Sequence, residues 1–328
     1  MRPTRRPSTH AVSPRRMSRP TGTLLILGPQ RPRPNLAAAL VEAGASGPIG
    51  VVTAGWRHDE SELAPLRRDL PFEPVLLPLY GWFDRVMNDH PELRDAYRLR
   101  QARVLAMKSL YRVRLSLAFQ AVLRVHKSAT GFDDLDQAAL LDAVEVLRAL
   151  DASAAQACDD IRAGFPMVGP DHPAVRPLHD ELAALLSTCN SLAIAGGHVA
   201  VLLNRIRFFG LDRLLEGFLA RGGVLAAWSA GAMVLGPRVV LFYDDPPEGP
   251  SEPEVLDRGL CLFADRLLFP HARRRLRTDD PARLRLLRAR FGKCLGLENG
   301  AWVEIRGSGF TDRSDPGSLL VLAPPEAP

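Results

Sequence analysis

Residues 223–236 read GVLAAWSAGAMVLG and join two apolar segments through a single serine, Ser229. The run VLAAW before the serine is typical of a buried strand, and AGAMVL after it is typical of a short helix. Small residues at the junction suit a sharp turn from strand to helix. This pattern predicts an α/β sheet that carries Ser229 at the carboxyl end of one strand.

Strand and helix patterns alternate on both sides of this stretch. The sequence predicts strands at residues 22–28, 49–54, 74–79, 191–195 and 223–228, with helices at 34–43, 60–69, 199–209 and 211–220. Further short strands are expected at residues 237–242, 259–263, 266–269, 294–298 and 301–306. Alternating strands and helices indicate a mostly parallel sheet flanked by helices.

A long helical region interrupts this alternation at residues 83–188. Helical patterns cover residues 94–126, 136–161 and 174–186, and the first is rich in arginine. A basic helix can bind polyanions, but such arginines more often form a solvated face. We therefore expect a single α/β domain at residues 21–328, with a helical insertion at about 83–188 that caps the site or contacts a second copy.

The positive charge is concentrated at the amino terminus. Residues 1–20 contain six arginines and no acid, and without them the formal charge of +5 would fall to −1. This Pro-, Ser- and Arg-rich tail has no apolar segment typical of a secretion signal, so we expect it to be disordered. We therefore do not expect the domain itself to bind nucleic acid, and no run of residues is long and apolar enough to span a membrane. The four cysteines lack CxxC spacing and are expected to be reduced core thiols of a cytoplasmic protein.

Ser229 has two interpretations. On a strand–turn–helix elbow it would be a nucleophile, and the amide of Ala230 at the helix start would face a developing oxyanion. Alternatively, it is a helix N-cap serine, which is common. A nucleophilic serine needs a base, so the histidines decide between the two.

His271 follows the apolar run LLFP at the carboxyl end of an expected strand, where sites of α/β sheets gather. His198 follows Gly196-Gly197 in the sequence and is the second candidate, while the other six histidines lie in the tail or in surface-like contexts. An acid should orient the base, and Asp244 and Glu298 both follow expected strands. Each also suits a turn or hairpin, so the choice of acid stays open.

Gly196-Gly197 lies between an expected strand and helix, where bare amides could complete an oxyanion hole or simply form a tight turn. The chain has neither the G-x-G-x-x-G pattern of dinucleotide-binding proteins nor a P-loop. Metal-ligand spacing is also absent from the sequence. We therefore expect no cofactor and no metal.

Together these segments resemble the peptidase E and cyanophycinase family of serine peptidases, which have a class I glutamine amidotransferase-like, flavodoxin-like fold. The resemblance is carried by VLAAWSAGAMVLGP (224–237), AIAGGHVAVLL (193–203) and PHARRRLR (270–277). It implies Ser229 as nucleophile, His271 as base, Asp244 as acid, and Gly197 and Ala230 as oxyanion donors. Arg275 and Arg277 take the places of the family's spaced arginines.

The chain departs from the family pattern at several positions. Ala227 replaces a glycine, His198 replaces an amide or acidic residue, and Ala272 replaces a phenylalanine. These changes bear on specificity more than on the nucleophile. Arg57, Arg275 and Arg277 are candidates for holding an acidic substrate group.

Three functions follow from these observations. The first is a serine hydrolase that cleaves a peptide or another amide bond. The second is a non-catalytic protein of the same fold that binds partners through the helical insertion, and the third is a polyanion-binding protein. A homo-oligomer is compatible with each.

Overall fold

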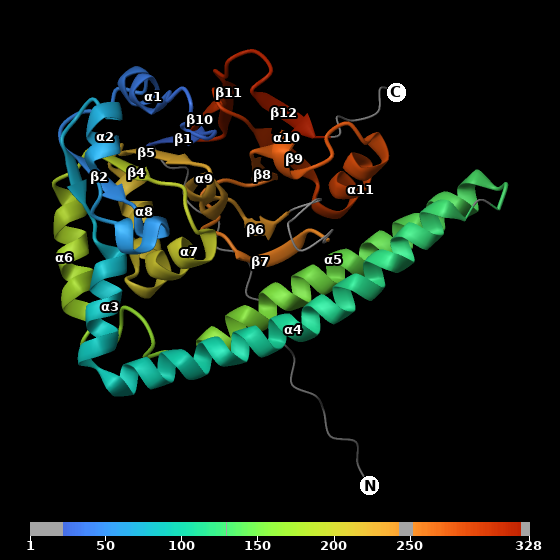
Figure 1. Cartoon of the computed structure of the whole chain (residues 1–328), viewed down its shortest axis with the longest axis horizontal. Helices are drawn as coiled ribbons and strands as arrows, with labels where there is room; N and C mark the ends of the chain where they lie inside the picture. The colour runs from blue at the N-terminus through green and yellow to red at the C-terminus, as the bar shows by residue number, and fades with distance from the viewer. Residues whose placement is uncertain (1–21, 129, 243–251, 323–328) are drawn as a thin grey trace, which may run out of the picture.

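A computed structural model describes residues 22–128, 130–242 and 252–322, and it contains one large sheet (Figure 1). The strands of this seven-stranded sheet run in the order β11-β10-β1-β5-β4-β2-β3. They are β1 (Thr23–Leu27), β2 (Ile49–Val52), β3 (Pro74–Leu76), β4 (Ser191–Ile194), β5 (Val224–Trp228), β10 (Trp302–Arg306) and β11 (Gly309–Asp312). Strands β1 to β5 are parallel, whereas β10 and β11 add an antiparallel edge. The predicted mostly parallel α/β fold is therefore confirmed.

Apolar residues on both faces of the parallel strands explain why helices cover the sheet on two sides. In β1, Leu25 and Leu27 pack with helices α1 (Leu36–Glu42) and α2 (Ala64–Asp69), whereas Leu24 and Ile26 belong to the core on the opposite face. That second core includes helices α7 (Val199–Phe208), α8 (Leu211–Ala220) and α9 (Ala230–Leu235). The alternation of side chains along each strand produces this division.

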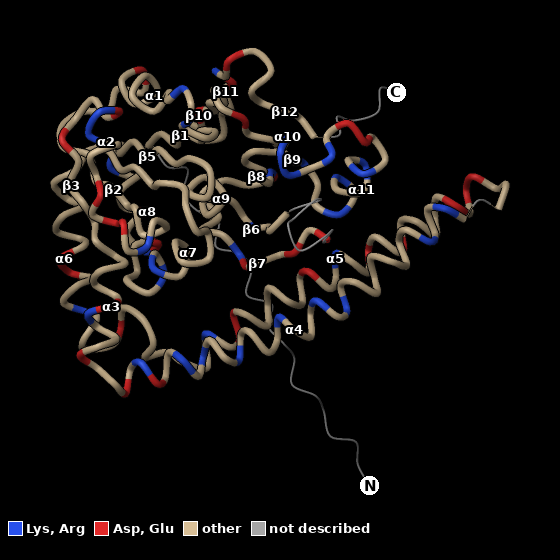
Figure 2. The backbone as a smooth tube through the Cα atoms, in the orientation of Figure 1, with Lys and Arg blue, Asp and Glu red and all other residues tan. Residues whose placement is uncertain are grey.

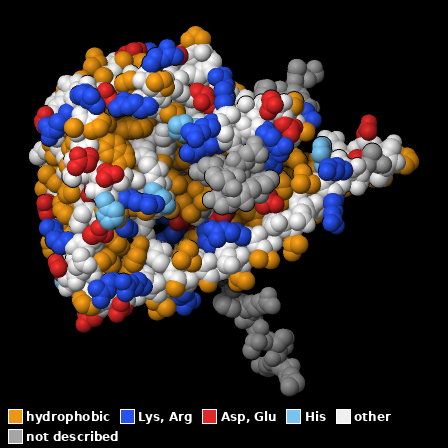
Figure 3. All heavy atoms as spheres, in the orientation of Figure 1, with side chains coloured by type: hydrophobic (Ala, Val, Ile, Leu, Met, Phe, Trp, Pro, Cys, Tyr) orange, Lys and Arg blue, Asp and Glu red, His pale blue; other side chains and the backbone are white. Residues whose placement is uncertain are grey.

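Four helices connect β3 to β4. They are α3 (Leu79–Asp89), α4 (Pro91–Lys127), α5 (Asp133–Ala163) and α6 (Arg176–Ser187). Helices α4 and α5 form a long hairpin whose tip extends beyond the sheets (Figure 1). Lys and Arg residues are frequent along α4 (Figure 2), and apolar side chains are exposed along the hairpin (Figure 3).

The carboxyl-terminal part of the chain builds two smaller sheets. One has the order β12-β9-β8 and the other pairs β6 with β7. Their strands are β6 (Arg238–Leu241), β7 (Glu254–Arg258), β8 (Arg266–Pro270), β9 (Lys293–Leu297) and β12 (Leu319–Leu322). The short helix α10 (Ala272–Arg275) follows β8, and α11 (Pro281–Phe291) precedes β9.

The predicted strand at residues 259–263 is wrong, because the strand in this region is β7, five residues earlier. Residues 259–263 instead form a loop against the end of α9, in which the amides of Leu260 and Leu262 donate to the carbonyls of Val234 and Leu235. Cys261 in this loop is exposed with a φ of 55°, so it is not the core thiol that we expected. The other three cysteines are buried.

The helix predicted at residues 60–69 is shorter than expected. A 3-10 helix, η1 (Ala54–Asp59), precedes it, and α2 begins only at Ala64. The predicted tail at residues 1–20 lies outside the described residues. Among the helices that the structure describes, none combines the length and the apolar character needed to cross a bilayer.

Candidate active site

Ser229 stands on a sharp turn between β5 and α9. Its φ of 49° and ψ of −120° lie in a region that residues with a side chain rarely adopt. Close packing imposes this turn: a Cβ on Gly231 would lie 2.2 Å from the carbonyl oxygen of Ile194, so the start of α9 approaches β4 closely. The Ser229 side chain makes no capping hydrogen bond to α9. The turn therefore has the strand–turn–helix geometry of an elbow, and the Ser229 side chain does not cap α9.

Ala227 is fully buried in the core on the face of the sheet that carries α7 and α9. It pairs with Ile26 of β1 and Ile194 of β4 in the sheet register. Its methyl group therefore contributes to the core and does not line the cavity described below.

The Gly196-Gly197 turn packs directly against this elbow. A Cβ on Gly196 would lie 2.8 Å from the Cβ of Ser229 and 3.5 Å from the amide nitrogen of Ala230. Gly197 has a φ of 142°, and a Cβ there would lie 2.6 Å from the carbonyl of Gly55. Both glycines are thus required by close approach. In the described part of the chain, no hydrogen bond uses the amide of Gly197 or of Ala230.

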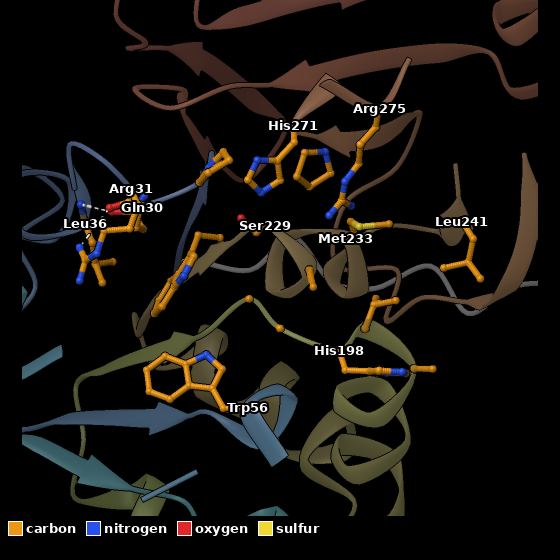
Figure 4. A pocket seen from close by; sticks show the side chains of 18 of the residues that line it. Gln30, Arg31, Leu36, Trp56, His198, Ser229, Met233, Leu241, His271 and Arg275 are labelled. Carbon is orange, nitrogen blue, oxygen red and sulfur yellow. Dashed lines mark hydrogen bonds between the residues drawn. The ribbon is translucent and has the colours of Figure 1, made fainter. Parts of the chain in front are cut away.

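His271 directly follows β8 and has a left-handed backbone, with φ 57° and ψ 38°. Its amide donates a hydrogen bond to the carbonyl of Leu297 at 2.9 Å, which attaches the turn after β8 to the end of β9. The imidazole is half-buried. In Figure 4, the Ser229 side chain points toward the side of the pocket on which His271 lies. Burial lowers the pKa of His271 below 6.5, and the positive charges of Arg275 and Arg274 lower it further.

The acid that would orient His271 is not assigned by these contacts. Asp244 lies outside the described residues. Glu298 follows β9, but its carboxylate accepts a hydrogen bond from the Arg273 amide at 2.8 Å. This bond ties the Glu298 carboxylate to the start of α10. Within the described residues, Glu298 makes no hydrogen bond to His271.

Ser229, His271, Gly197 and Ala230 all line one cavity of about 770 Å³. The cavity extends from Ser229 in two directions (Figure 4). Figure 4 shows Gln30, Leu36 and Trp56 along one arm and Met233 and Leu241 along the other. The lining also includes Leu66, Val199, Ala200, Trp228 and Phe242. The four predicted residues therefore come together although they are widely separated in the sequence.

His198 also lines the cavity, but it has a structural role. Its Nδ1 accepts a hydrogen bond from the Val201 amide at 3.3 Å and so caps the start of α7. The second ring nitrogen, Nε2, must then carry the proton in the neutral ring. Burial lowers the pKa of His198, and the nearby charge of Arg57 lowers it further.

The three candidate arginines differ in position. Arg275 lines the cavity, whereas Arg57 and Arg277 do not. Both of these residues are exposed, and Arg57 stands at a kink of η1 with a φ of 63°. Arg31 and Asp69 also line the cavity, and they form an ion pair of 2.7 Å.

Sequence reasoning missed the arm formed by the segment after β1 and by η1. Gln30 holds this segment, because its side-chain Oε1 accepts hydrogen bonds from the backbone amides of Asn35 and Leu36 at the start of α1. The rule that sites gather at the carboxyl ends of parallel strands could have identified residues 28–31, since β1 neighbours β5. Nothing in the sequence around Trp56 predicted that this residue would line the cavity.

Known proteins similar to this chain include peptidases. The model of peptidase family S51 matches residues 158–312, a segment that includes Gly197, Ser229 and His271. No curated protein sequence matches the chain significantly. A crystal structure of a peptidase from an acI-B1 actinobacterium aligns over 94% of this chain and 94% of its own, with 14% identity and a TM-score of 0.47. A protein assigned as peptidase E from Listeria monocytogenes EGD-e aligns over 90% of this chain and 98% of its own, with 11% identity and a TM-score of 0.41.

Proposed function

We propose that this chain is a serine-type peptidase of the peptidase E and cyanophycinase kind, as the match of family S51 to residues 158–312 supports, and that it cleaves amide bonds with Ser229 as nucleophile and His271 as base. One observation carries the proposal. Ser229 has the strained backbone of an elbow and shares a cavity with His271. Strained backbone is concentrated at functional sites, because the surrounding structure must maintain it.

The proposed reaction begins when His271 accepts the proton of the Ser229 hydroxyl, whose oxygen attacks the substrate carbonyl carbon. The amides of Gly197 and Ala230 stabilise the negative charge on the carbonyl oxygen. His271 then donates its proton to the leaving amine, which leaves an ester on Ser229. Water hydrolyses this ester with His271 again acting as base.

The acid of this site stays a prediction. Asp244 is the first candidate because of its spacing after Ser229, and Glu298 is the second. The hydrogen bond from the Arg273 amide to Glu298 disfavours the second candidate, since that carboxylate already has a partner.

A peptide or a small amide suits the cavity. Its arms are mainly apolar, and aromatic side chains such as Trp56 and Phe242 provide surface for apolar parts of a substrate. Arg275 supplies a positive charge next to His271 for a carboxylate of the substrate. Arg57 and Arg277 are weaker candidates for this role, because neither lines the cavity.

The test is covalent labelling with a fluorophosphonate probe, which reacts with activated serines. The wild-type protein should be labelled on one peptide that contains Ser229. Ser229→Ala should abolish labelling and turnover, and His271→Ala should reduce both by about a hundredfold or more, because the base is lost.

A matched control is Ser187→Ala at the exposed end of α6, which should be labelled like the wild type. Circular dichroism should show that every variant keeps its fold. Full labelling of Ser229→Ala would contradict the proposed nucleophile, and full activity of His271→Ala would contradict the proposed base.

A further inference from the structure

The outer face of α4 carries a continuous row of exposed apolar residues. The row contains Leu99, Ala102, Ala106, Leu110, Val113, Leu117 and Ala121. Successive members are three or four positions apart, so they lie on one face of the helix. The row is about 33 Å long, which is comparable to three heptads of a coiled coil. We call these seven residues the α4 row.

The α4 row contributes nothing to the chain's own core. Helix α4 packs against α5 and α11 through the opposite face, with Tyr111, Leu115, Phe119 and Val122. Leu110 and Leu117 remain 69% and 64% exposed, and no described residue covers them. Large exposed apolar patches are unusual on monomeric proteins and mark contact surfaces.

The charges of the hairpin identify the partner. Helix α4 contains nine Lys and Arg residues against two acids, whereas α5 contains eight Asp and Glu residues against two arginines. None of the ion pairs in the described part of the chain joins the two helices to each other. Arg114 and Arg124 on α4, and Asp134 and Asp142 on α5, are exposed and lack such a pair. The chain thus displays two surfaces of opposite charge.

The outer face of α5 also has apolar residues between its acids. Leu135, Ala138, Val146 and Ala149 are exposed at helical spacing, with Asp142 among them. This face therefore offers both apolar contacts and negative charge. Those are the two properties that complement the α4 row and its flanking arginines.

We propose that the hairpin binds a second copy of this chain, with the α4 row of one protomer against the outer face of α5 of the other. Complementary charge selects this pairing, because α4 against α4 would bring two strongly basic helices together. The contact also removes the apolar residues of both helices from water. This inference concerns assembly and does not depend on the catalytic proposal.

The first test compares two exposed leucines of α4 by analytical ultracentrifugation. Leu110 belongs to the α4 row, whereas Leu105 is 64% exposed and lies about 140° away around the helix. The wild-type protein should self-associate, as a dimer or a larger species, at micromolar concentrations. Leu110→Asp should weaken self-association at least tenfold, and Leu105→Asp should leave it unchanged.

The second test uses charge reversal to identify the faces in contact. One variant carries Arg114→Glu and Arg124→Glu on α4, and the other carries Asp134→Lys and Asp142→Lys on α5. Each variant alone presents two faces of like charge and should be mainly monomeric at low salt. Their mixture restores opposite charges between α4 of the one variant and α5 of the other, and the two variants should associate.

Three outcomes would overturn the proposal. The first is a monomeric wild type, the second is self-association insensitive to Leu110→Asp, and the third is a mixture that stays monomeric. Vesicles with anionic lipids distinguish the main alternative: a monomer that binds them, and that loses binding through Leu110→Asp, would make α4 a membrane-contact surface. Probe labelling of Ser229 should persist in all four variants, since none of the changes touches the cavity.

Discussion

Ser229 is the residue at which local preference and tertiary packing disagree most strongly. A non-glycine residue in such a backbone region costs about 1–3 kcal/mol, so the neighbouring structure must enforce it. The close contacts of Gly231 with Ile194 and of Gly196 with Ser229 show where that enforcement comes from. The hydroxyl is thereby exposed to the cavity without a hydrogen bond to its own helix.

The pKa of His271 gives a prediction about pH. A general base acts in its neutral form, and the lowered pKa of His271 extends the neutral form to more acidic pH than in an ordinary histidine. The acid limb of the rate of Ser229 labelling should therefore have its midpoint below pH 6.5. Arg274→Gln removes one of the charges that lower this pKa, so the midpoint should move upward.

The measurement is the labelling rate as a function of pH at low salt, where exposed charges are least screened. Arg285→Gln on α11 removes an exposed charge that does not line the cavity, and it should leave the midpoint unchanged. A midpoint that does not respond to Arg274→Gln would argue against His271 as the group that titrates.

The sequence predicted the centre of the site better than its walls. Ser229, His271 and Gly197 lie beside expected strands, so their positions followed from the alternation of strands and helices. Trp56 could not be found in this way, because it lies in η1, a short 3-10 helix with a kink at Arg57 that the alternation of strands and helices does not predict. Such a kink depends on tertiary contacts that no local pattern encodes.

At the scale of secondary-structure elements, a buried polar cluster attaches the hairpin to the carboxyl-terminal sheets. Asp151 of α5 is fully buried, and its carboxylate accepts hydrogen bonds from Arg290 of α11 at 2.7 and 2.8 Å. Tyr111 of α4 donates to the same carboxylate at 2.7 Å. The amide of Val255 in β7 donates to the Tyr111 hydroxyl, so four elements meet at this cluster.

Removal of Asp151 should therefore destabilise the protein strongly. Asp151→Ala leaves the buried guanidinium of Arg290 without its ion pair, and breaking a buried pair in this way costs about 3–5 kcal/mol. Urea unfolding followed by circular dichroism measures the change in the free energy of unfolding. The control Asp160→Ala removes an exposed acid from the same helix and should cost about 0.5 kcal/mol or less. Equal stability of the two variants would contradict this role for the cluster.

Long elements with strong periodicity were predicted well, and short ones were not. The patterns at residues 94–126 and 136–161 correspond to α4 and α5, because a helix of this length repeats its apolar spacing many times. Strand β7 was missed because Glu254, Asp257 and Arg258 make its sequence polar, and its single fully buried apolar residue is Val255. Pairing with β6 and packing on α5 produce this strand.

At the scale of the whole molecule, the size of the cavity limits the substrate. A volume of about 770 Å³ is typical of sites for small ligands. We expect short peptides to be cleaved and folded proteins to be spared. Mass spectrometry of digests of a peptide library and of a folded protein measures this difference. Efficient cleavage within a folded protein, lost in Ser229→Ala, would show that the cavity does not limit access.

Ser229 and His271 belong to different sheets, one following β5 of the seven-stranded sheet and the other following β8 of the three-stranded sheet. Helix α9 packs against β8 and so joins the two parts directly behind the serine. Neither sheet alone contains a complete site. A shift of one sheet relative to the other by about 1 Å would separate the proposed base from the nucleophile while leaving both sheets intact. Catalytic competence is then a measure of how the two sheets are docked, and it can be lost well before the protein unfolds.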